Sequence, residues 1–440
     1  MMTPVSPRPA PSPPSWYAAS EPPLPLNPPL RGAGVADVCV LGAGYTGLSA
    51  ALALAEAGFR VTVLEAQRIG WGASGRNGGQ AIVGYGCEQD TLERLLGADE
   101  ARVLFDFSRQ GMARLRERIA RHHIACDWRD GHASVPIRAR QERDLRAGVI
   151  EMAQRYDYPL QWWDKAQLQQ QLASDRYRGA MYDPASGHLH PLAYAHGLAR
   201  AALAAGVTIH EYSPVQRLQR GKQPELHTAE GHVRADFVVL AGNAWLAGIA
   251  PELESRMMPV GTYIGATPPL GEGRARALIR NDMAVADVNW ALDYFRLSRD
   301  HRLLFGGRAS YSALPPPGLR GVMSRPPPRW PMPRCWPTSR PRAWCWSTVV
   351  SMPPPRTCPV WAMVSPCSRC RPCWPTARMP PASWPVAMTS RKRCLPASTR
   401  PWQTKAWWSR SMTASRSPHR CTWSSWPRAR TPSWPGTIAT

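Results

Sequence analysis

The chain has 440 residues, an apolar content of 44 % that is ordinary for a soluble globular protein, and a formal net charge of +23. The charge is uneven, because residues 1–324 contain 35 basic and 31 acidic residues and so carry a net charge of only +4. This near balance argues against a nucleic-acid partner for residues 1–324. Residues 1–324 contain three of the 11 cysteines, without paired spacing, and no apolar segment of membrane-spanning length, which predicts a cytoplasmic protein with no membrane span.

Residues 1–35 contain eleven prolines and lack the apolar core of a secretory signal, so we assign them to a Pro-rich N-terminal segment. The next stretch, "ADVCVLGAGYTGLSAALALAEAGFRVTVLEA" (Ala36–Ala66), contains a buried strand, a glycine turn, an Ala/Leu-rich helix and a second strand. This order predicts a βαβ unit in a parallel sheet that is covered on both faces.

Further elements follow in chain order. Residues 91–183 are charged, with apolar side chains at helical spacing, and are expected to form helices of a second layer. Pro191 and Gly206 mark the start and the end of another helix, which a strand follows. Residues 231–246 read as a strand that enters a small-residue turn, and alternating stretches in 259–307 predict antiparallel strands of a mixed sheet.

The predicted fold class is therefore α/β, with a Rossmann-type dinucleotide-binding domain, a second mixed-sheet α+β substrate domain, and no predicted fold for residues 325–440. The dinucleotide-binding domain is expected to be discontinuous, and the substrate domain to fill the gaps in it. The predicted ranges are 36–90 and 186–250 for the first domain, and 91–185 and 251–324 for the second.

A glycine pattern lies between the first strand and the helix. Gly42, Gly44 and Gly47 form G-x-G-x-x-G, and Glu65 lies 18 residues beyond Gly47, at the end of the second strand. The first glycine permits a tight turn, the second lets backbone amides approach a pyrophosphate, and the third allows close helix packing. The acid can accept hydrogen bonds from a ribose hydroxyl. The pattern predicts a dinucleotide site, against the alternative of a glycine turn that binds no nucleotide.

A second glycine-rich loop, "RIGWGASGRNGGQ" (Arg68–Gln80), follows the second strand closely. Its backbone can lie against a ligand, and the guanidinium of Arg76 can bind a phosphate or a ring carbonyl. A flexible surface loop is the alternative. The position beside the dinucleotide turn favours the binding role.

A resemblance to a known family rests on five segments: "SWYAAS", "ADVCVLGAGYTGLSAALALAEAGFRVTVLEA", "RIGWGASGRNGGQ", "FVVLAGNAWL" and "RLLFGG". With these segments, residues 1–324 resemble the FAD-dependent oxidoreductases of the D-amino-acid oxidase type, and most closely the gamma-glutamylputrescine oxidases of bacterial putrescine breakdown. The resemblance implies FAD as the cofactor. It also implies hydride transfer from the carbon beside an amine to the flavin, hydrolysis of the imine to an aldehyde, and reduction of O2 to H2O2.

The resemblance also implies positions around the cofactor. The glycine turn would hold the pyrophosphate, Glu65 the adenosine ribose, Val215 the adenine through its backbone, and the loop after Arg68 would run toward the flavin ring. The expected cofactor-binding residues are Gly42, Gly44, Tyr45, Thr46, Gly47, Glu65, Ala66, Ser74, Gly75, Arg76, Asn77, Val215, Ala241 and Gly242.

Substrate contacts are less constrained by the sequence. Tyr263, Tyr294 and Arg296 lie on predicted strands of the substrate domain, where an arginine beside tyrosines could bind a carboxylate such as a glutamyl group. The alternative is that Arg296 is a solvated strand residue and that the tyrosines only pack. His188 and His190 flank a helix start and are expected to cap it locally. No catalytic triad and no metal-ligand spacing is found in residues 1–324.

Residues 325–440 have a different composition. They contain no Asp or Glu, 19 Lys and Arg, 23 Pro, 13 Trp, 8 Cys, and a single Leu. A basic Trp-rich module for single-stranded nucleic acid would need a fold that this composition does not support. A disordered linker would normally be poor in Trp and Cys.

A third interpretation is translation in a wrong reading frame of GC-rich DNA, beginning near Ser324. Reading the codons of Trp361–Pro366 from the third base of the Trp codon forces two glycines and permits Gly-His-Gly-Val-Ala-Leu. That string resembles the motif by which the last segment of this family approaches the flavin. The sequence therefore predicts a frameshift, an out-of-frame tail without a fold, and a chain that is inactive as printed.

The functional prediction is an FAD-dependent amine oxidoreductase that acts on gamma-glutamylputrescine or a related amine, with O2 or another electron acceptor. Another amino-acid or sarcosine-type oxidase or dehydrogenase of the same fold is the alternative within the enzyme class. A nucleic-acid-binding protein that uses the basic tail is the alternative from a different class.

Overall fold

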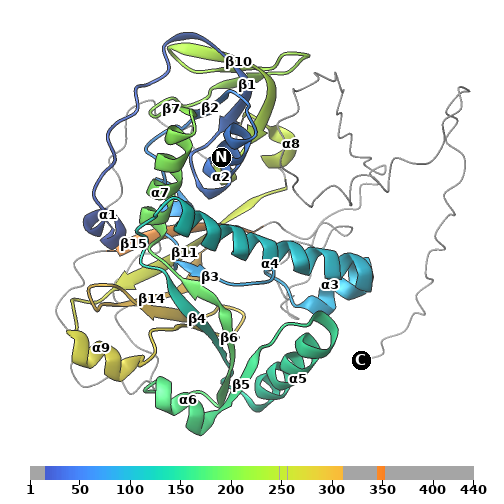
Figure 1. Cartoon of the computed structure of the whole chain (residues 1–440), viewed down its shortest axis with the longest axis vertical. Helices are drawn as coiled ribbons and strands as arrows, with labels where there is room; N and C mark the ends of the chain where they lie inside the picture. The colour runs from blue at the N-terminus through green and yellow to red at the C-terminus, as the bar shows by residue number, and fades with distance from the viewer. Residues whose placement is uncertain (1–14, 247, 255, 311–343, 352–440) are drawn as a thin grey trace, which may run out of the picture. The chain divides into compact units, whose positions relative to one another are not determined.

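The first sheet is built around the predicted βαβ unit. In the computed structural model, which describes residues 15–246, 248–254, 256–310 and 344–351, its strand order is β7-β2-β1-β10-β9-β8 (Figure 1). Strand β1 runs parallel to both β2 and β10, and β2 runs parallel to β7, as the sequence predicts. The strands are β1 (Gly32–Leu41), β2 (Val61–Leu64), β7 (Thr208–His210), β8 (Arg217–Gln219), β9 (Glu225–His227) and β10 (Gly231–Leu240).

Two helices, α2 (Tyr45–Glu56) and α7 (Pro191–Ala204), cover one face of this sheet. Apolar side chains of β1, β2 and β7 form one buried cluster with both helices. Alternate residues of the same strands, such as Cys39 and Leu64, enter a second cluster on the other face together with Leu246 and Leu253, the latter in α8 (Pro251–Glu254). Burial on both faces explains why the strands of β1 and β2 are nearly continuous apolar runs.

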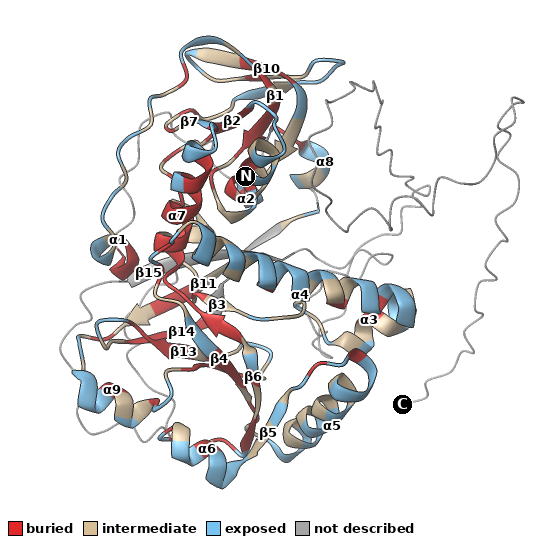
Figure 2. Ribbon diagram, in the orientation of Figure 1, coloured by how far each residue is buried: buried red, intermediate tan, exposed pale blue. Residues whose placement is uncertain are grey.

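Helix α7 has the predicted start and end. Pro191 occupies its first turn, where the missing amide costs no hydrogen bond, and Gly206 follows its end with a φ of 87°. Most residues of α7 are buried (Figure 2).

The second sheet has nine strands, in the order β15-β11-β14-β13-β12-β4-β6-β3, with β5 paired to β6. One face is covered by α6 (Lys165–Gln171) and α9 (Glu272–Leu278), whose residues share a buried cluster with Val135, Val285 and Phe295. The strands are β3 (Gln80–Ala81), β4 (Arg129–Val135), β5 (Gln161–Asp164), β6 (Gly179–His188), β11 (Met258–Ala266), β12 (Ala284–Asp287), β13 (Tyr294–Leu297), β14 (Leu303–Ser310) and β15 (Trp344–Ser351).

The expectation of helices alone for residues 91–183 is wrong. Helices α3 (Gln89–Leu96), α4 (Ala98–Arg121) and α5 (Ala139–Tyr156) do form there, but β4, β5 and β6 lie in the same range. These strands carry polar and small residues, such as the "DGHAS" of β4, so they lack the apolar alternation that marks a strand. They are stabilised by their neighbours in the sheet. The antiparallel pairing expected for 259–307 is confirmed for β11, β12, β13 and β14. Strand β12 also pairs β4 in parallel, which makes the sheet mixed, as predicted.

The two ends of the described chain add one element and correct one expectation. Residues from Ser15 onward belong to the fold, because helix α1 (Trp16–Ser20) buries both Trp16 and Tyr17. Within 325–440, which were predicted to have no fold, β15 pairs antiparallel with β11. Its aromatic and β-branched composition suits a strand. The other residues of that range lie outside the described residues.

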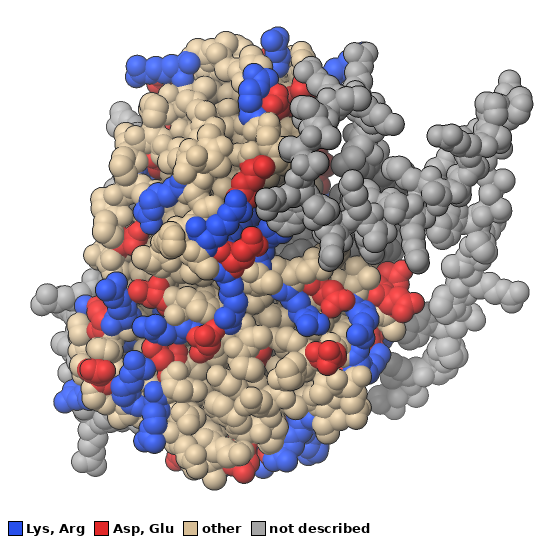
Figure 3. Space-filling view, viewed as in Figure 1, with Lys and Arg blue, Asp and Glu red and all other residues tan. Residues whose placement is uncertain are grey.

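Surface charges of both signs are interspersed on the face in Figure 3, in keeping with the near balance of residues 1–324. Among the described residues, no helix is both long and apolar enough to cross a membrane. All of these residues lie in one of two compact units, Met1–Arg369. The predicted limits of the two domains within that unit stay predictions.

Candidate functional site

Residues that are far apart in the sequence meet at the carboxyl edge of the first sheet. Strands β1, β2 and β10 are parallel and end side by side, so Gly42, Glu65 and Ala241 follow three neighbouring strands. The amide of Gly42 donates to the carbonyl of Leu64 at 2.8 Å, and the amide of Ala241 donates to that of Leu41 at 2.9 Å. Ligands of open α/β sheets bind at such an edge, where the connections on either side of a central strand diverge.

The glycines leave no room for side chains in the turn itself. A Cβ on Gly42, whose φ is 103°, would lie 2.6 Å from the carbonyl oxygen of Ala241. A Cβ on Gly47 would lie 1.9 Å from the carbonyl oxygen of Gly42. The turn, the start of α2 and the end of β10 are therefore packed backbone against backbone, which leaves a cradle formed by main-chain atoms.

The amino end of α2 supplies donors to this cradle. Gly44 is its N-cap and provides no side-chain cap, so the amides of Thr46 and Gly47 have no acceptor inside the helix. The amide of Tyr45 donates to the hydroxyl oxygen of Ser74 at 3.0 Å. Thr46 is exposed. Free amides and the helix dipole at this end favour a pyrophosphate.

Glu65 is held by the turn yet keeps acceptor capacity. One carboxylate oxygen accepts from the amide of Ala43 at 2.7 Å and the other from the amide of Gln67 at 2.9 Å. Each oxygen has a further lone pair, and the residue is partly exposed, so a ribose hydroxyl can donate to it. Burial raises the pKa of Glu65, the backbone donors of Ala43 and Gln67 lower it, and the nearby charge of Glu211 raises it further.

Glu211 is a residue that the sequence did not single out. It follows β7, is fully buried, and accepts from the amides of Asn27 and Ile69, both at 2.9 Å. Arg68 lies 3.3 Å from the same carboxylate. Glu211 therefore fixes the beginning of the second glycine-rich loop. The sequence could have indicated Glu211, because it follows the next parallel strand, β7, just as Glu65 follows β2.

The second glycine-rich loop contains the short helix η1 (Ala73–Gly75) and is closed on itself by Asn77. The side-chain amide of Asn77 donates to the carbonyls of Ala73 and Ser74, both at 3.1 Å, and its oxygen accepts from the amide of Gly79 at 2.7 Å. Asn77 therefore shapes the loop. Gly75 is buried there, and a Cβ on it would lie 2.2 Å from the carbonyl of Gly70.

Arg76 lies on the side of the loop that faces the end of β10. Its guanidinium is 4.9 Å from the ring centre of Trp71, and that ring packs edge to face against Trp245 at 6.3 Å. Trp245 belongs to η2 (Asn243–Trp245), directly after Gly242. The loop and the turn after β10 are thus neighbours, as a shared ligand requires.

Val215 lies between β7 and β8, and Ser213 anchors its segment by donating its amide to the carbonyl of Glu65 at 2.8 Å. The side chain of Val215 packs against the apolar cluster under the sheet edge. Neither its amide nor its carbonyl takes part in a backbone hydrogen bond with another described residue. The adenine contact expected for Val215 stays a prediction, and Ala66 lies partly exposed beside Glu65.

The structure separates the three predicted substrate contacts. Tyr263 is buried among Phe295 and Leu297 on the face of the second sheet that α6 and α9 cover. Tyr294 instead packs with the cluster around Trp16 and α1. A β-bulge between Gly261 and Tyr263 interrupts the regular pairing of β11 with β14.

Arg296 is only 3 % exposed, so the alternative of a solvated strand residue is wrong. It lies next to the second glycine-rich loop and donates from Nε to the carbonyl of Gly78 at 2.7 Å. Tyr294 borders the same glycine, since a Cβ on Gly78 would lie 2.7 Å from its ring. Tyr294 and Arg296 therefore lie beside the expected flavin loop, and Tyr263 does not.

Of the two histidines, His190 is a cap as predicted, because its Nδ1 accepts from the amide of Ala193 at 3.1 Å at the start of α7. His188 ends β6 and its Nε2 lies 2.7 Å from the carbonyl of Asp282, so the cap expected for it is wrong. Burial, reinforced by the charge of Arg296, lowers the pKa of His188 to about 3 and that of His190 to about 4. Both histidines are neutral at physiological pH.

This edge defines a dinucleotide-binding α/β protein with a second sheet whose residues reach the cofactor loop. The family model described as FAD dependent oxidoreductase matches residues 37–354. Gamma-glutamylputrescine oxidoreductase of Escherichia coli (strain K12) is 43 % identical over 303 residues, which are 69 % of this chain and 71 % of that protein. A probable oxidoreductase, OrdL, of Haemophilus influenzae is 44 % identical over 289 residues, covering 64 % of this chain and 67 % of that protein.

The crystal structure of glycine oxidase from Geobacillus kaustophilus has the same fold, with a TM-score of 0.57 at 21 % identity over 72 % of this chain and 84 % of that one. The chain therefore belongs to the family of FAD dependent oxidoreductases. The predictions of an FAD-dependent oxidoreductase and of this α/β fold are confirmed. The glycine cradle, the free amides of α2 and the acceptor of Glu65 fit FAD. The individual contacts remain predictions.

Proposed function

We propose that the chain derives from an amine oxidase that acts on gamma-glutamylputrescine or a closely related amine and passes the electrons to O2, giving H2O2. Two observations support this proposal. The chain is similar to the gamma-glutamylputrescine oxidoreductase of Escherichia coli, and it has the glycine cradle at the carboxyl edge of the first sheet. When bound, FAD supplies the acceptor for a hydride from the carbon beside the amine. The residues of the chain bind the cofactor and the amine and orient them for this transfer.

The substrate proposal concerns the surface beside Gly78. Arg296 uses three of its five N–H donors within the chain, donating to the carbonyl of Gly78, the carbonyl of Leu297 and the hydroxyl of Tyr17. Its two other donors can serve a substrate carboxylate, and Tyr294 borders the same place. Tyr263 is not carried forward, because it lies in the core on the other face of the sheet.

A second candidate is an amino-acid or sarcosine-type oxidase or dehydrogenase, which the shared fold with glycine oxidase favours. The two are separated by an assay of the enzyme with its reading frame restored, for peroxide with gamma-glutamylputrescine, glycine and sarcosine in turn. We expect turnover with the first amine alone. Protein that carries flavin but oxidises only an amino acid would contradict the substrate, and colourless protein that binds single-stranded nucleic acid would contradict the whole proposal.

We further propose that residues beyond Ser324 were translated out of frame. The composition change supports this proposal, while the family match extends to residue 354 and β15 lies within that interval. Sequencing the gene decides it: an insertion or deletion near codon 324 is expected, and restoring the frame should give peroxide-producing enzyme. An uninterrupted frame that ends after Thr440 would contradict it.

A further inference from the structure

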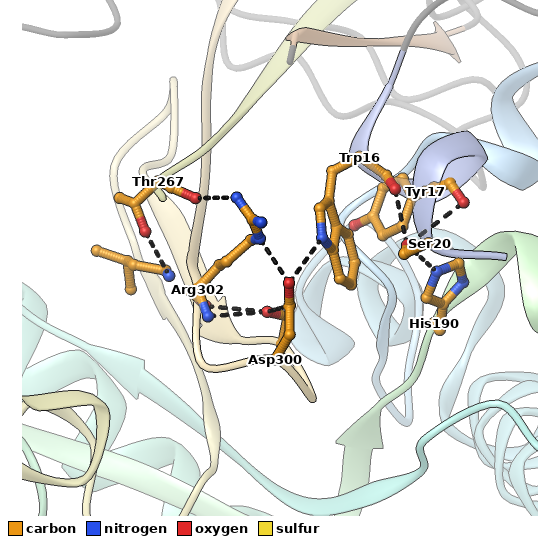
Figure 4. Close-up of polar contacts among 9 residues, drawn as sticks. Trp16, Tyr17, Ser20, His190, Thr267, Asp300 and Arg302 are labelled. Atoms are coloured by element: carbon orange, nitrogen blue, oxygen red, sulfur yellow. Dashed lines mark hydrogen bonds and ion pairs between the residues drawn. The ribbon is translucent and has the colours of Figure 1, made fainter. Parts of the chain in front are cut away.

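Helix α1 joins the layers of the two sheets (Figure 4). On one side, the hydroxyl of Ser20 lies 3.0 Å from Nε2 of His190, at the start of α7. On the other side, the indole N–H of Trp16 donates to the carboxylate of Asp300 at 3.4 Å, in the hairpin between β13 and β14. The rings of Trp16 and Tyr17 both pack against His190 at about 5 Å. The position of α1 is thus fixed from two directions.

Tyr17 and Arg296 together bind two consecutive carbonyls of the second glycine-rich loop. The hydroxyl of Tyr17 donates to the carbonyl of Asn77 at 2.8 Å, and Nε of Arg296 donates to the carbonyl of Gly78 at 2.7 Å. Nη2 of Arg296 donates to the hydroxyl of Tyr17 at 3.2 Å, which links the two holding groups. The loop is therefore held by side chains 60 and 218 residues away in the sequence.

The burial of the Arg296 guanidinium has to be compensated by other interactions, because burial of a cation without a counter-ion costs free energy. Among the described residues, Arg296 forms no ion pair within 4 Å, and its partners are two carbonyls and one hydroxyl. A charged donor makes stronger hydrogen bonds to carbonyls than a neutral one does. These hydrogen bonds offset part of the cost of burial, and two of them tie Arg296 to Gly78 of the loop and to Tyr17.

The contact also depends on Gly78 and Gly79 at the end of the loop. A Cβ on Gly79, whose φ is 71°, would lie 2.7 Å from Nη2 of Arg296 and 2.1 Å from the carbonyl of Leu189. A Cβ on Gly78 would meet the ring of Tyr294 at 2.7 Å. The backbone of the loop therefore lies directly on β13, and the pair Gly78 and Gly79 permits this approach.

We propose that Tyr17 and Arg296 form a two-point clamp that sets the position of residues Ser74 to Gly79 against the bound cofactor. Toward the cofactor both are positioning residues, because they hold the loop and do not touch the reacting atoms. The proposal rests on the proposed function in one respect, namely that this loop faces FAD. Small displacements of a binding loop cost affinity and rate, so the clamp matters to both.

The test compares Tyr17→Phe, which removes one hydroxyl and keeps the ring, with the matched control Tyr85→Phe. Tyr85 also donates a single phenol hydrogen bond to a carbonyl, that of Leu104 at 2.9 Å, outside the loop. Hydrogen exchange of the peptide that covers residues 73–79 is measured on the full chain without added FAD. We expect faster exchange of this peptide in Tyr17→Phe and wild-type exchange in Tyr85→Phe.

Arg296→Lys is the second variant, and Arg116→Lys is its control. Arg116 also donates to a carbonyl, with a hydrogen bond of 2.9 Å to Ala185, but this bond lies outside the loop. FAD affinity is then titrated by flavin fluorescence, and the circular dichroism of the bound flavin is recorded. We expect roughly tenfold weaker FAD binding for each clamp variant, and less than the product of the two effects in the double variant.

Equal loop exchange in Tyr17→Phe and Tyr85→Phe would overturn the clamp. Wild-type protein that binds no FAD would overturn the proposed function, while the exchange comparison would still decide whether the clamp exists. Unfolding by denaturant separates a general loss of stability from the local effect: the clamp variants should unfold near their controls, and the loop alone should exchange faster.

Discussion

The two sides of the cofactor site are built differently. At the edge of the first sheet, main-chain atoms of the turn after β1, the end of β2 and the end of β10 form the cradle, and glycines are required because backbone meets backbone. On the side of the second sheet, the buried side chains of Tyr17 and Arg296 hold the loop, and the partly buried ring of Tyr294 borders it. Geometry made by the backbone leaves a motif in the sequence, whereas geometry made by remote side chains leaves none.

The strongest test of whether the cradle is built by the backbone is the substitution Gly47→Ala. Its Cβ would lie 1.9 Å from the carbonyl oxygen of Gly42, so either α2 or the turn has to move. We expect protein without flavin, and a free energy of unfolding lower by about 3 kcal/mol. Flavin absorbance and denaturant unfolding check this. Gly148→Ala in α5, where a Cβ meets nothing within 4 Å, should keep its flavin and its stability; loss of flavin there too would contradict the argument.

On the second-sheet side the structure predicts a dependence on pH. Burial lowers the pKa of His132 to about 4, that of His188 to about 3 and that of His190 to about 4. Well above pH 6.5 all three are neutral in both the folded and the unfolded state. As the pH falls below 6.5 the unfolded chain takes up protons first, so the free energy of unfolding falls between about pH 6.5 and pH 4.

The expected loss is roughly 2 kcal/mol for each of these histidines at pH 5. Denaturant unfolding at pH 7.5 and pH 5 measures it. His132→Gln should lose less stability between the two pH values than the wild type does, because it removes one titrating group. An equal loss in both proteins would show that His132 is not buried in its neutral form.

Glu65→Gln tests the contribution of a side chain to the cradle, because it leaves the glycines unchanged. Both carboxylate oxygens accept backbone amides, so the amide group of Gln would place a donor against a donor. We expect FAD binding to weaken about tenfold or more, in line with about 1.5–3 kcal/mol for a hydrogen bond to a charged group. The exposed Glu230→Gln, which affects only the surface pair with Arg31, should bind FAD like the wild type.

The smallest expected effect is that of Ser74→Ala. The hydroxyl of Ser74 accepts from the amide of Tyr45 at the start of α2, so its loss resembles the loss of a helix cap. We expect about 1 kcal/mol in stability and a minor change in FAD affinity, measured by the same titration and unfolding experiments. A loss as large as that of Gly47→Ala would mean that the cradle depends on side chains after all.

The sequence predicted the elements whose signals are local. The βαβ unit, the glycine turn and Glu65 all lie within about 30 residues, and the limits of α7 follow from Pro191 and Gly206. Strands β4 and β6 were missed, because their polar residues are paired with neighbouring strands. The sequence grouped Tyr263 with Tyr294 and Arg296, whereas the structure places it in the core, because its position depends on the packing of β11, whose register against β14 shifts beside it.

The sequence by itself therefore determined the class of protein, the cofactor cradle and the change in composition near residue 324. Only the tertiary structure decided that α1 is part of the fold, that Glu211 fixes the loop after β2, and that Arg296 is buried against the carbonyl of Gly78. The physical reason is range. Backbone conformation and helix signals act over a few residues, whereas the burial of a charge and its hydrogen-bond partners depends on segments up to 279 residues apart.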